Sequence, residues 1–367
     1  MLNMSLEYEK TSSVNDYYPS GEFMIRLKQA LMERSDNSFE HRLKLLKHSL
    51  QTAIELEHAT IPPYLYALYS IKTAENLEIA HLIKSIVKQE MLHMSLDCNV
   101  LNAIGGHPKI DHPRFIPHYP GTLPGSVEDS LIVPLAALSK QLVSDVFMVI
   151  EEPEQTVDGD ASPPDGVTIG EFYQHIIDEI TELSKMGNIF TGNPERQLVT
   201  GFAELQNQGV YDENTATNAL KLIIDQGEGS TSSPIDTEHE LAHYYKFAEI
   251  YHGRKLIPNP TPEAGQPEWL FEGHRIVFDP CGVYPVISNP NRHSYESQPR
   301  VEDLNRTFNR TYSDMLRKLH HVFNGQPDKL ALSLLSMQSL REQAQLLMTQ
   351  EVVPGQTAGP TFDYIPA

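Results

Sequence analysis

Three helix-forming segments of this chain carry acidic or imidazole side chains where the helical pattern calls for a buried aliphatic residue. In a core-facing helix, apolar residues recur at spacings of three and four. Five residues interrupt or begin such stripes: Glu57 (stripe 50–68), Glu90 and His93 (79–101), and Glu240 and His243 (240–250). Burying a lone carboxylate is costly unless it is paired or binds a metal ion. Because several helices share this exception, we expect these groups to face one another in the core.

A Glu-x-x-His spacing places both side chains on one helix face, where they can bind a metal ion. The chain contains five copies. Two copies lie on the apolar stripes of their helices: Glu90/His93 and Glu240/His243. Three copies lie off the stripes: Glu55/His58, Glu78/His81 and Glu249/His252. In helical phase, Glu78 is about 120° from Glu90 and Glu249 about 180° from Glu240. We expect these three copies to lie on solvated faces.

Two Glu-x-x-His helices and one Glu from each of two other helices form the ligand set of ferritin-like di-iron and di-manganese bundles. Glu57 supplies one single carboxylate, and the helix ending near 152 should supply the other. Periodicity does not separate Glu151 from Glu152 there. Glu228, at the end of a further predicted helix, is another candidate, as a ligand, an outer acid or a helix-end charge.

The ligand types favour iron or manganese over zinc, because structural zinc prefers thiolates and tetrahedral sites. We therefore expect two iron ions, with manganese as the alternative. A core network of hydrogen-bonded Glu and His without metal is the competing interpretation.

Helical periodicity dominates the chain and predicts an all-α fold. The expected helices lie near residues 22–33, 41–72, 76–104, 130–152, 169–187, 214–228, 237–252, 302–324 and 327–350, and the one expected strand at 274–279. Residues 253–301 are rich in Pro and Gly and too long for an ordinary connector. We predict an N-terminal arm (1–40), a ferritin-like di-metal bundle (41–252), and a Pro-rich irregular cap with two C-terminal helices packed on the bundle (253–367).

Three further features of the bundle helices each have two interpretations. Pro62 and Pro63 either open a passage by a kink or end the straight part of their helix. Asp97, one turn after His93, is either an exposed acid, the more common case, or an acceptor for a ligand histidine. Four tyrosines either line a pocket for an aromatic substrate or, as is more common, belong to the core. They are Tyr64, Tyr66, Tyr244 and Tyr245.

The charge balance excludes some classes of partner. The chain has 28 Lys and Arg residues against 49 Asp and Glu, a formal net charge of −21. Such acidity argues against nucleic acid and against an anionic membrane surface. Cys98 and Cys281 cannot form a disulfide framework, the first residues lack a signal-peptide pattern, and the longest apolar stretch is too interrupted for a membrane span. We expect a cytoplasmic protein.

Several segments resemble the ferritin-like domain of the iminophenyl-pyruvate dimer synthase type. They are AIELEHATIPPYLYALYSI (53–71), IVKQEMLHMSLDCNVLNAIGGHP (86–108), VIEEPE (149–154), GEG (227–229) and ELAHYYKFAEIYHGRKL (240–256). GVYPV (282–286), FNRTYSDML (308–316) and AGPTF (358–362) are similar to segments that follow the domain in stand-alone members. The resemblance implies that the acid of the I-E-x-P-E pattern, Glu151, and that of the G-E-G pattern, Glu228, belong to the metal site. The family name implies oxidative coupling of imines derived from aromatic amino acids.

We expect an O2- or peroxide-dependent non-haem di-iron oxidoreductase of secondary metabolism that acts on a small organic substrate. The candidate substrate is an aromatic compound derived from an amino acid. The expected metal ligands are Glu57, Glu90, His93, Glu151, Glu240 and His243, with Glu228 as a further candidate. The alternatives are a non-catalytic iron-binding ferritin relative and a catalase-like peroxide scavenger. The expected partners are the substrate and O2 or peroxide, without nucleic acid or membrane, and a homodimer is left open.

Overall fold

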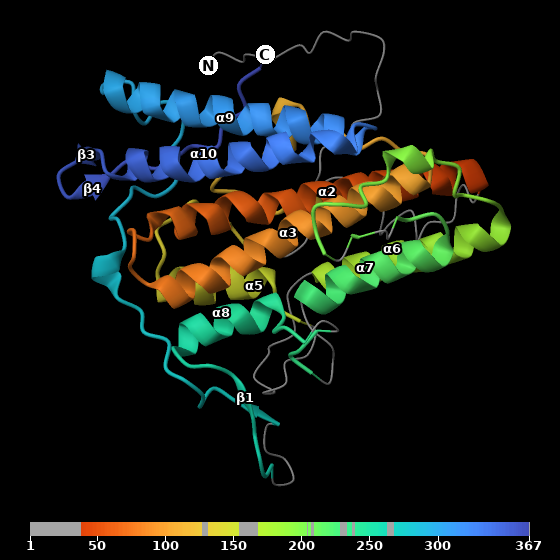
Figure 1. The fold of residues 1–367 in the computed structure, drawn as a ribbon, viewed down its shortest axis with the longest axis horizontal. Coiled ribbons are helices and arrows are strands. Elements are labelled where there is room, and N and C mark those ends of the chain that lie inside the picture. Colours follow the sequence, from red (N-terminus) through yellow and green to blue (C-terminus); the bar gives the residue numbers. More distant parts are fainter. Residues whose placement is uncertain are drawn as a thin grey trace, which may run out of the picture.

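The computed structural model describes residues 38–366 except 127–130, 154–167, 204, 207–208, 228–232, 237–238 and 263–267. The helix expected near 22–33 and Glu228 lie outside the described residues. Within them the fold is all-α, as predicted, with short strand pairs at its edges (Figure 1). No helix of the described part is long and apolar enough to cross a membrane.

A pair of long neighbouring helices forms the centre of the bundle. They are α2 (Phe39–Ser70) and α3 (Leu77–Ala103). Two further helices, α6 (Ile169–Met186) and α7 (Glu213–Gly227), pack on each other and on this pair (Figure 1). Helix α8 (His243–His252) packs against α3 at the other end of the bundle. Most of the buried apolar side chains between these helices form one continuous core.

Helix α2 continues through Pro62 and Pro63 to Ser70. Proline at position 63 cannot donate the backbone hydrogen bond that the carbonyl of Ala59 would accept in an unbroken helix. The hydroxyl of Tyr119 donates to that carbonyl instead, at 2.6 Å. The proline pair therefore does not end the helix, and a side chain from the loop after α3 supplies the missing donor.

The helix predicted at 130–152 is shorter than expected. The structure has α4 (Lys140–Leu142), a π-helical turn η3 (Val143–Phe147) and α5 (Met148–Ile150). Residues 131–139 are extended, because Pro134 disfavours helix before it and the backbone amides have other acceptors. The N–H of Leu135 donates to Asn289 Oδ1 and that of Leu138 to Ser70 Oγ.

The helix predicted at 237–252 also begins late, at His243. Two hydrogen bonds join Asp236 and Glu240 before it: the N–H of Glu240 donates to Asp236 Oδ1 and the N–H of Asp236 to the carbonyl of Glu240, both at 2.8 Å. These bonds use the backbone groups that an earlier helical start would need. Glu240 therefore precedes α8 rather than belonging to it.

The C-terminal helices α9 (Pro299–Phe323) and α10 (Leu330–Met348) pack on each other and form a layer over α2 (Figure 1). Asn102 of α3 donates to the carbonyl of Phe323 at 2.7 Å and so ties α9 to the bundle. Five short 3-10 turns complete the helical elements: η1 (Pro113–Phe115), η2 (Pro124–Ser126), η4 (Pro194–Arg196), η5 (Pro280–Gly282) and η6 (Pro327–Lys329).

The strand predicted at 274–279 is absent. Backbone groups there bond to a turn after α8, where the N–H of Ile276 donates to the carbonyl of Gly253, and only Arg275 forms an isolated bridge, with Arg254. A strand needs a continuous neighbour for its ladder, and the described part of the chain places none beside this segment. The strand pairs lie elsewhere: β1 (Ile257–Pro258) with β2 (Trp269–Leu270), and β3 (Glu351–Val353) with β4 (Gln356–Thr357).

Candidate metal centre

Five of the predicted site residues meet in the core of the bundle. They are Glu57 on α2, Glu90 and His93 on α3, Glu151 directly after α5, and His243 at the start of α8, each at most 4% exposed. They form two groups, Glu57/Glu90/His93 and Glu90/Glu151/His243, whose potential ligand atoms lie within 4.8 Å of one another. Because Glu90 belongs to both groups, it lies where a carboxylate could bridge two cations.

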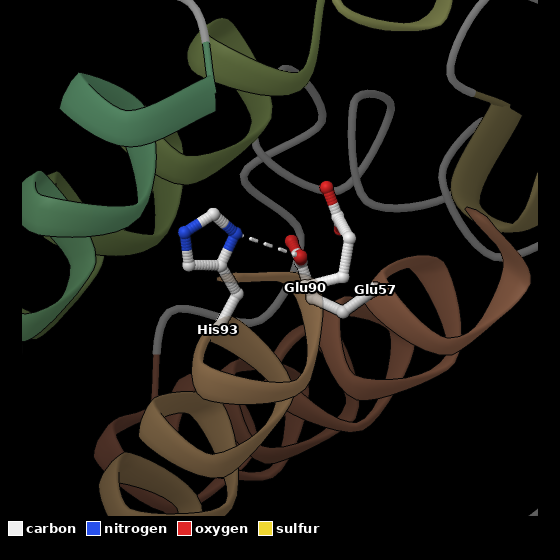
Figure 2. A group of neighbouring side chains, drawn as sticks. All are labelled: Glu57, Glu90 and His93. Atoms are coloured by element: carbon white, nitrogen blue, oxygen red, sulfur yellow. Dashed lines mark ion pairs between the residues drawn. The ribbon is translucent and has the colours of Figure 1, made fainter. Parts of the chain in front are cut away.

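In the first group, His93 faces Glu57 across the gap between α3 and α2 (Figure 2). Nδ1 of His93 lies 3.3 Å from Oε2 of Glu57. Nε2 of the same ring bonds to the amide oxygen of Gln226 at 2.9 Å. An amide oxygen only accepts, so Nε2 carries the hydrogen and Nδ1 presents a lone pair in the neutral ring. Two electron-rich atoms at this distance call for a cation between them.

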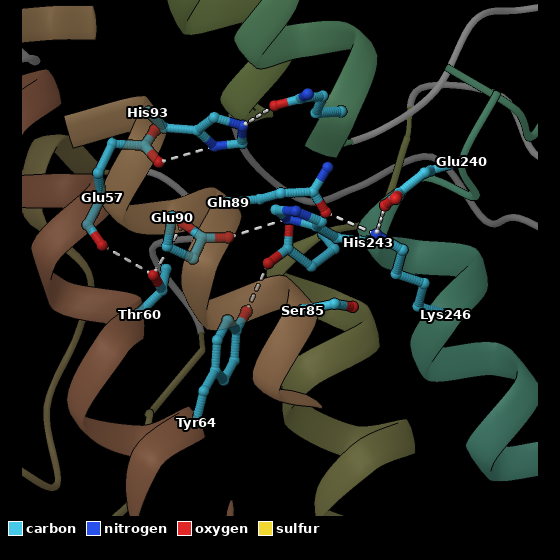
Figure 3. A network of polar contacts seen from close by, with 12 residues as sticks. Glu57, Thr60, Tyr64, Ser85, Gln89, Glu90, His93, Glu240, His243 and Lys246 are labelled. Carbon is cyan, nitrogen blue, oxygen red and sulfur yellow. Dashed lines mark hydrogen bonds and ion pairs between the residues drawn. The ribbon is translucent and has the colours of Figure 1, made fainter. Parts of the chain in front are cut away.

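The second group repeats this arrangement around His243 (Figure 3). Nδ1 of His243 lies 2.9 Å from Oε1 of Glu90 and 3.5 Å from Oε2 of Glu151. Neither ring nitrogen of His243 has a hydrogen-bond partner among the described residues. A fully buried imidazole without such partners is costly in a protein core. A metal ion would satisfy Nδ1, so the side chains present fit a di-metal centre.

Hydroxyl groups hold the remaining carboxylate oxygens. The phenol of Tyr173, on α6, donates to Oε1 of Glu57 at 2.5 Å, and that of Tyr64, on α2, to Oε1 of Glu151 at 2.6 Å. The hydroxyl of Thr60 lies 3.0 Å from Oε2 of Glu90 and 2.8 Å from the backbone carbonyl of Glu57, and these two oxygens share its single proton (Figure 3). Each of the three carboxylates thus keeps one oxygen engaged with a hydroxyl and the other directed at a histidine.

Asp97 is fully buried beside this network rather than exposed. Its Oδ2 lies 2.7 Å from the hydroxyl of Tyr173, which has one proton and already donates to Glu57. Burial, and then the charge of Glu57, raise the pKa of Asp97 well above its ordinary value. Asp97 therefore carries a proton and donates it to the oxygen of Tyr173. The interpretation of Asp97 as an exposed acid is wrong.

Burial governs the protonation of the centre without metal. It raises the pKa of Glu90 well above its ordinary value, and the charges of Glu151 and Glu57 raise it further. A proton held here must leave before a cation binds to the carboxylate. Apolar side chains from α2, α6 and α7 line the rest of the site: Leu56, Ile169 and Ile223.

The enclosed space is small. The cavity between the ligand groups has a volume of about 10 Å³, close to the smallest volume that holds one water molecule. It has room for about one ion or water molecule and is much smaller than any aromatic substrate.

Glu240 does not reach the cluster. Its side chain is 60% exposed and lies 3.3 Å from the ammonium group of Lys246, which is itself buried and also donates to Gln89 Oε1 at 2.5 Å (Figure 3). The Glu-x-x-His spacing puts two side chains on one face only within a helix, and Glu240 precedes α8. The prediction that Glu240 faces the metal site together with His243 is therefore contradicted by its position.

The structure also separates Glu151 from Glu152, which periodicity left open: Glu151 lies in the cluster, whereas Glu152 is partly exposed. Three residues expected on solvated faces are buried. Glu249 is paired with Lys255 at 2.7 Å, Glu55 accepts from Gln51 at 3.1 Å, and His58 lies 2.6 Å from the hydroxyl of Tyr312.

Sequence reasoning missed the supporting residues Tyr173, Gln226 and Thr60, and left Tyr64 between pocket and core. Tyr64, Tyr66 and Tyr245 are core residues, although Tyr64 also contacts Glu151. Thr60 is one turn from Glu57 and could have been found by that spacing. Tyr173 and Gln226 lie on other helices, and no local pattern in the sequence connects them to the cluster.

Carboxylates and imidazoles from several helices, with one shared carboxylate, define a candidate di-metal protein of the helical-bundle class. Residues 50–252 match the Ferritin-like family model, and the chain belongs to this family. The fold is also similar to that of a ferritin-like protein from Caulobacter vibrioides, with 22% sequence identity, a TM-score of 0.57, and coverage of 86% of this chain and 97% of that one. A comparison with curated proteins finds no match.

Proposed function

We propose that this protein is a non-haem di-iron oxidoreductase that uses O2 or peroxide to oxidise a small organic substrate. The observation that carries the proposal is the pair of buried ligand groups that share Glu90. Glu57, Glu90 and His93 would hold one iron ion, and Glu90, Glu151 and His243 the other. When bound, two iron ions in such a bundle supply electrons and open coordination positions for an oxidant.

The surrounding side chains have roles that do not depend on the metal. Leu56, Ile169 and Ile223 keep bulk water from the centre, which strengthens every charge interaction inside it. Tyr64 and Tyr173 orient the two outer carboxylates through their hydroxyls.

The resemblance in the sequence suggests an aromatic substrate derived from an amino acid. The rings beside the second ligand group do not line the cavity: Tyr64 packs in the core against Phe147 at 4.7 Å and Phe247 at 5.1 Å, between centroids. Because the cavity is about 10 Å³, such a substrate requires the centre to open. The expected partners are therefore this substrate and O2 or peroxide.

The size of the cavity favours a second candidate function, a catalase-like peroxide scavenger. Hydrogen peroxide is far smaller than an aromatic substrate, so it would require much less opening of the centre. An iron-binding protein without catalytic activity would need the same ligands. These candidates share the metal and differ in the reaction.

Metal analysis followed by turnover assays tests the proposal. The full chain, produced with iron supplied, should retain about two iron ions per chain, and Glu90→Gln should retain neither. Consumption of O2 that depends on an added aromatic amino or keto acid supports the oxidoreductase. Release of O2 from peroxide without any organic substrate supports the scavenger instead. Absence of iron and manganese from the purified protein, with no change in its melting temperature on adding either, contradicts both.

A further inference from the structure

The two ligand groups are related by an approximate internal symmetry. In each, an outer carboxylate accepts from a tyrosine with Oε1 and faces a histidine Nδ1 with Oε2. Glu57 does so between Tyr173 and His93, at 2.5 Å and 3.3 Å. The second group consists of Glu151, Tyr64 and His243, with distances of 2.6 Å and 3.5 Å. The pattern leaves one oxygen of each outer carboxylate directed at the space where a cation would lie.

The support behind these groups is not symmetric. On the first side, Tyr173 is held by Asp97 at 2.7 Å, and Nε2 of His93 is held by Gln226 at 2.9 Å. All three supporting side chains are at most 1% exposed. The carboxylate and the imidazole of this group are therefore each fixed by a partner that is itself buried.

On the second side this support is missing. Nε2 of His243 has no hydrogen-bond partner among the described residues, so only the contacts of Nδ1 with Glu90 and Glu151 orient its ring. The ring of Tyr64 packs against Phe147 and Phe247, which offer its hydroxyl no polar partner. Glu151 directly follows α5 and the π-helical turn, where the α-helical ladder is interrupted.

We infer that the two metal positions are unequal: the Glu57/His93 position binds its ion tightly and fills first, and the Glu151/His243 position binds weakly and fills second. Tyr173 and Tyr64 act as positioning residues, one for each position. The inference rests on the proposed di-metal centre. Hydrogen-bond partners of metal ligands typically change metal affinity by about 10- to 100-fold, so the asymmetric support is large enough to separate two binding steps.

This inequality fits the proposed reaction. The weakly bound ion is the one whose ligand His243 has a ring nitrogen without a hydrogen-bond partner among the described residues, so its ligands can rearrange most easily when the centre opens. The Glu57/His93 position keeps Glu90 in place while the ligands of the Glu151/His243 position rearrange.

Calorimetric titration of the metal-free full chain with Mn2+ tests the inference. The wild type should show two binding steps whose dissociation constants differ by at least about 10-fold. Tyr173→Phe should weaken the tight step by about 10- to 100-fold and leave the weak step unchanged, and Tyr64→Phe should do the reverse. Gln226→Leu provides an independent variant on the first side and should also weaken the tight step alone.

Tyr66→Phe is the matched control, because Tyr66 is a buried tyrosine of α2 whose hydroxyl donates to the carbonyl of Ile287, away from the centre. It should leave both steps unchanged. The visible absorption of bound Co2+ provides a second readout, because a carboxylate released by Tyr173→Phe can bind with both oxygens and change the coordination number of the first ion only.

The outcomes separate this inference from the proposed function. If the wild type binds no metal ion, the proposed function fails as well. If two ions bind with one common affinity, the inequality is wrong and the di-metal centre stands. If Tyr173→Phe and Tyr64→Phe each weaken both steps equally, or lower the melting temperature without moving either step, the tyrosines are structural and their assignment to separate positions is wrong.

Discussion

Glu240 and His243 are three residues apart in the chain and lie in opposite environments: the side chain of Glu240 is 60% exposed and that of His243 is 1% exposed. The cause is the start of α8 at His243. A spacing of three brings side chains together only inside a helix. Glu90 and His93, by contrast, both lie inside α3, and both side chains reach the centre.

The first prediction compares Glu90, which lies in both ligand groups, with Glu240, which lies in neither. Glu90→Gln should lower metal affinity by at least about 100-fold, because Glu90 is common to both ligand groups. It should also raise the free energy of unfolding of the metal-free protein by about 1 kcal/mol, since it removes one of several buried acids kept for function. Metal analysis and thermal unfolding of the metal-free protein measure the two effects.

Glu240→Gln is the matched control for this prediction. It removes a carboxylate of the same length that contacts Lys246 rather than the cluster. We expect unchanged metal content. A loss of metal equal to that of Glu90→Gln would mean that Glu240 is a ligand after all.

A second prediction concerns Glu228, which lies outside the described residues and is implicated by the sequence resemblance. Its neighbour Gly227 lines the cavity, and a Cβ atom added there would lie 3.8 Å from Oε2 of Glu151. With Glu240 outside the cluster, the described residues of the His243 side include one acid fewer than the usual set. Glu228→Gln should therefore weaken one of the two metal-binding steps by about 10-fold or more, as measured by calorimetry. Asp225→Asn, three residues earlier on α7, is the control and should have no effect.

The sequence predicted the bundle and most of the cluster for a definite physical reason. Glu57, Glu90 and His93 stand in the middle of long regular helices, where a stripe of apolar residues fixes which face is buried. Glu151 and Glu240 stand next to helix ends, where one or two residues of shift change the face. Periodicity therefore could not choose between Glu151 and Glu152, and it placed Glu240 on the buried face of a helix that begins only after it. The buried His58 was misplaced because Tyr312 of α9 contacts that face of α2, a contact between segments far apart in the chain.

The third prediction is a pH dependence of metal binding. Burial raises the pKa of Glu90 and of Asp97 in the folded, metal-free protein, whereas the unfolded chain titrates both near their ordinary values of 4.5 and 3.8. The folded state then binds more protons than the unfolded state above these values. Its stability therefore falls as pH rises from about 4 through the raised pKa values.

A bound metal ion replaces the proton on Glu90, so the stabilisation by metal should grow with pH. We expect excess Mn2+ to raise the melting temperature by on the order of 5 °C near pH 8 and by much less near pH 5. Melting curves with and without Mn2+ across this range measure the difference. Glu90→Gln should show no rise at any pH. A rise in the wild type that is the same at both ends of the range would contradict the assigned direction of the pKa of Glu90.

The last prediction concerns acid stability and His58, on the face of α2 turned toward α9. His58 is 2% exposed, its Nε2 lies 2.6 Å from the hydroxyl of Tyr312, and its Nδ1 has no hydrogen-bond partner among the described residues. Burial lowers the pKa of His58 from 6.5 to about 3. Between these values the unfolded chain binds a proton that the folded protein does not, so stability falls as pH falls from about 6.5. The loss approaches about 1.4 kcal/mol for each pH unit within this window.

His58→Gln, which can still bond to Tyr312, should unfold at a lower pH than the wild type in acid titrations followed by circular dichroism. The exposed His81→Gln should unfold at the same pH as the wild type. An acid midpoint of His58→Gln equal to that of the wild type would show that His58 does not set the acid limit of the fold.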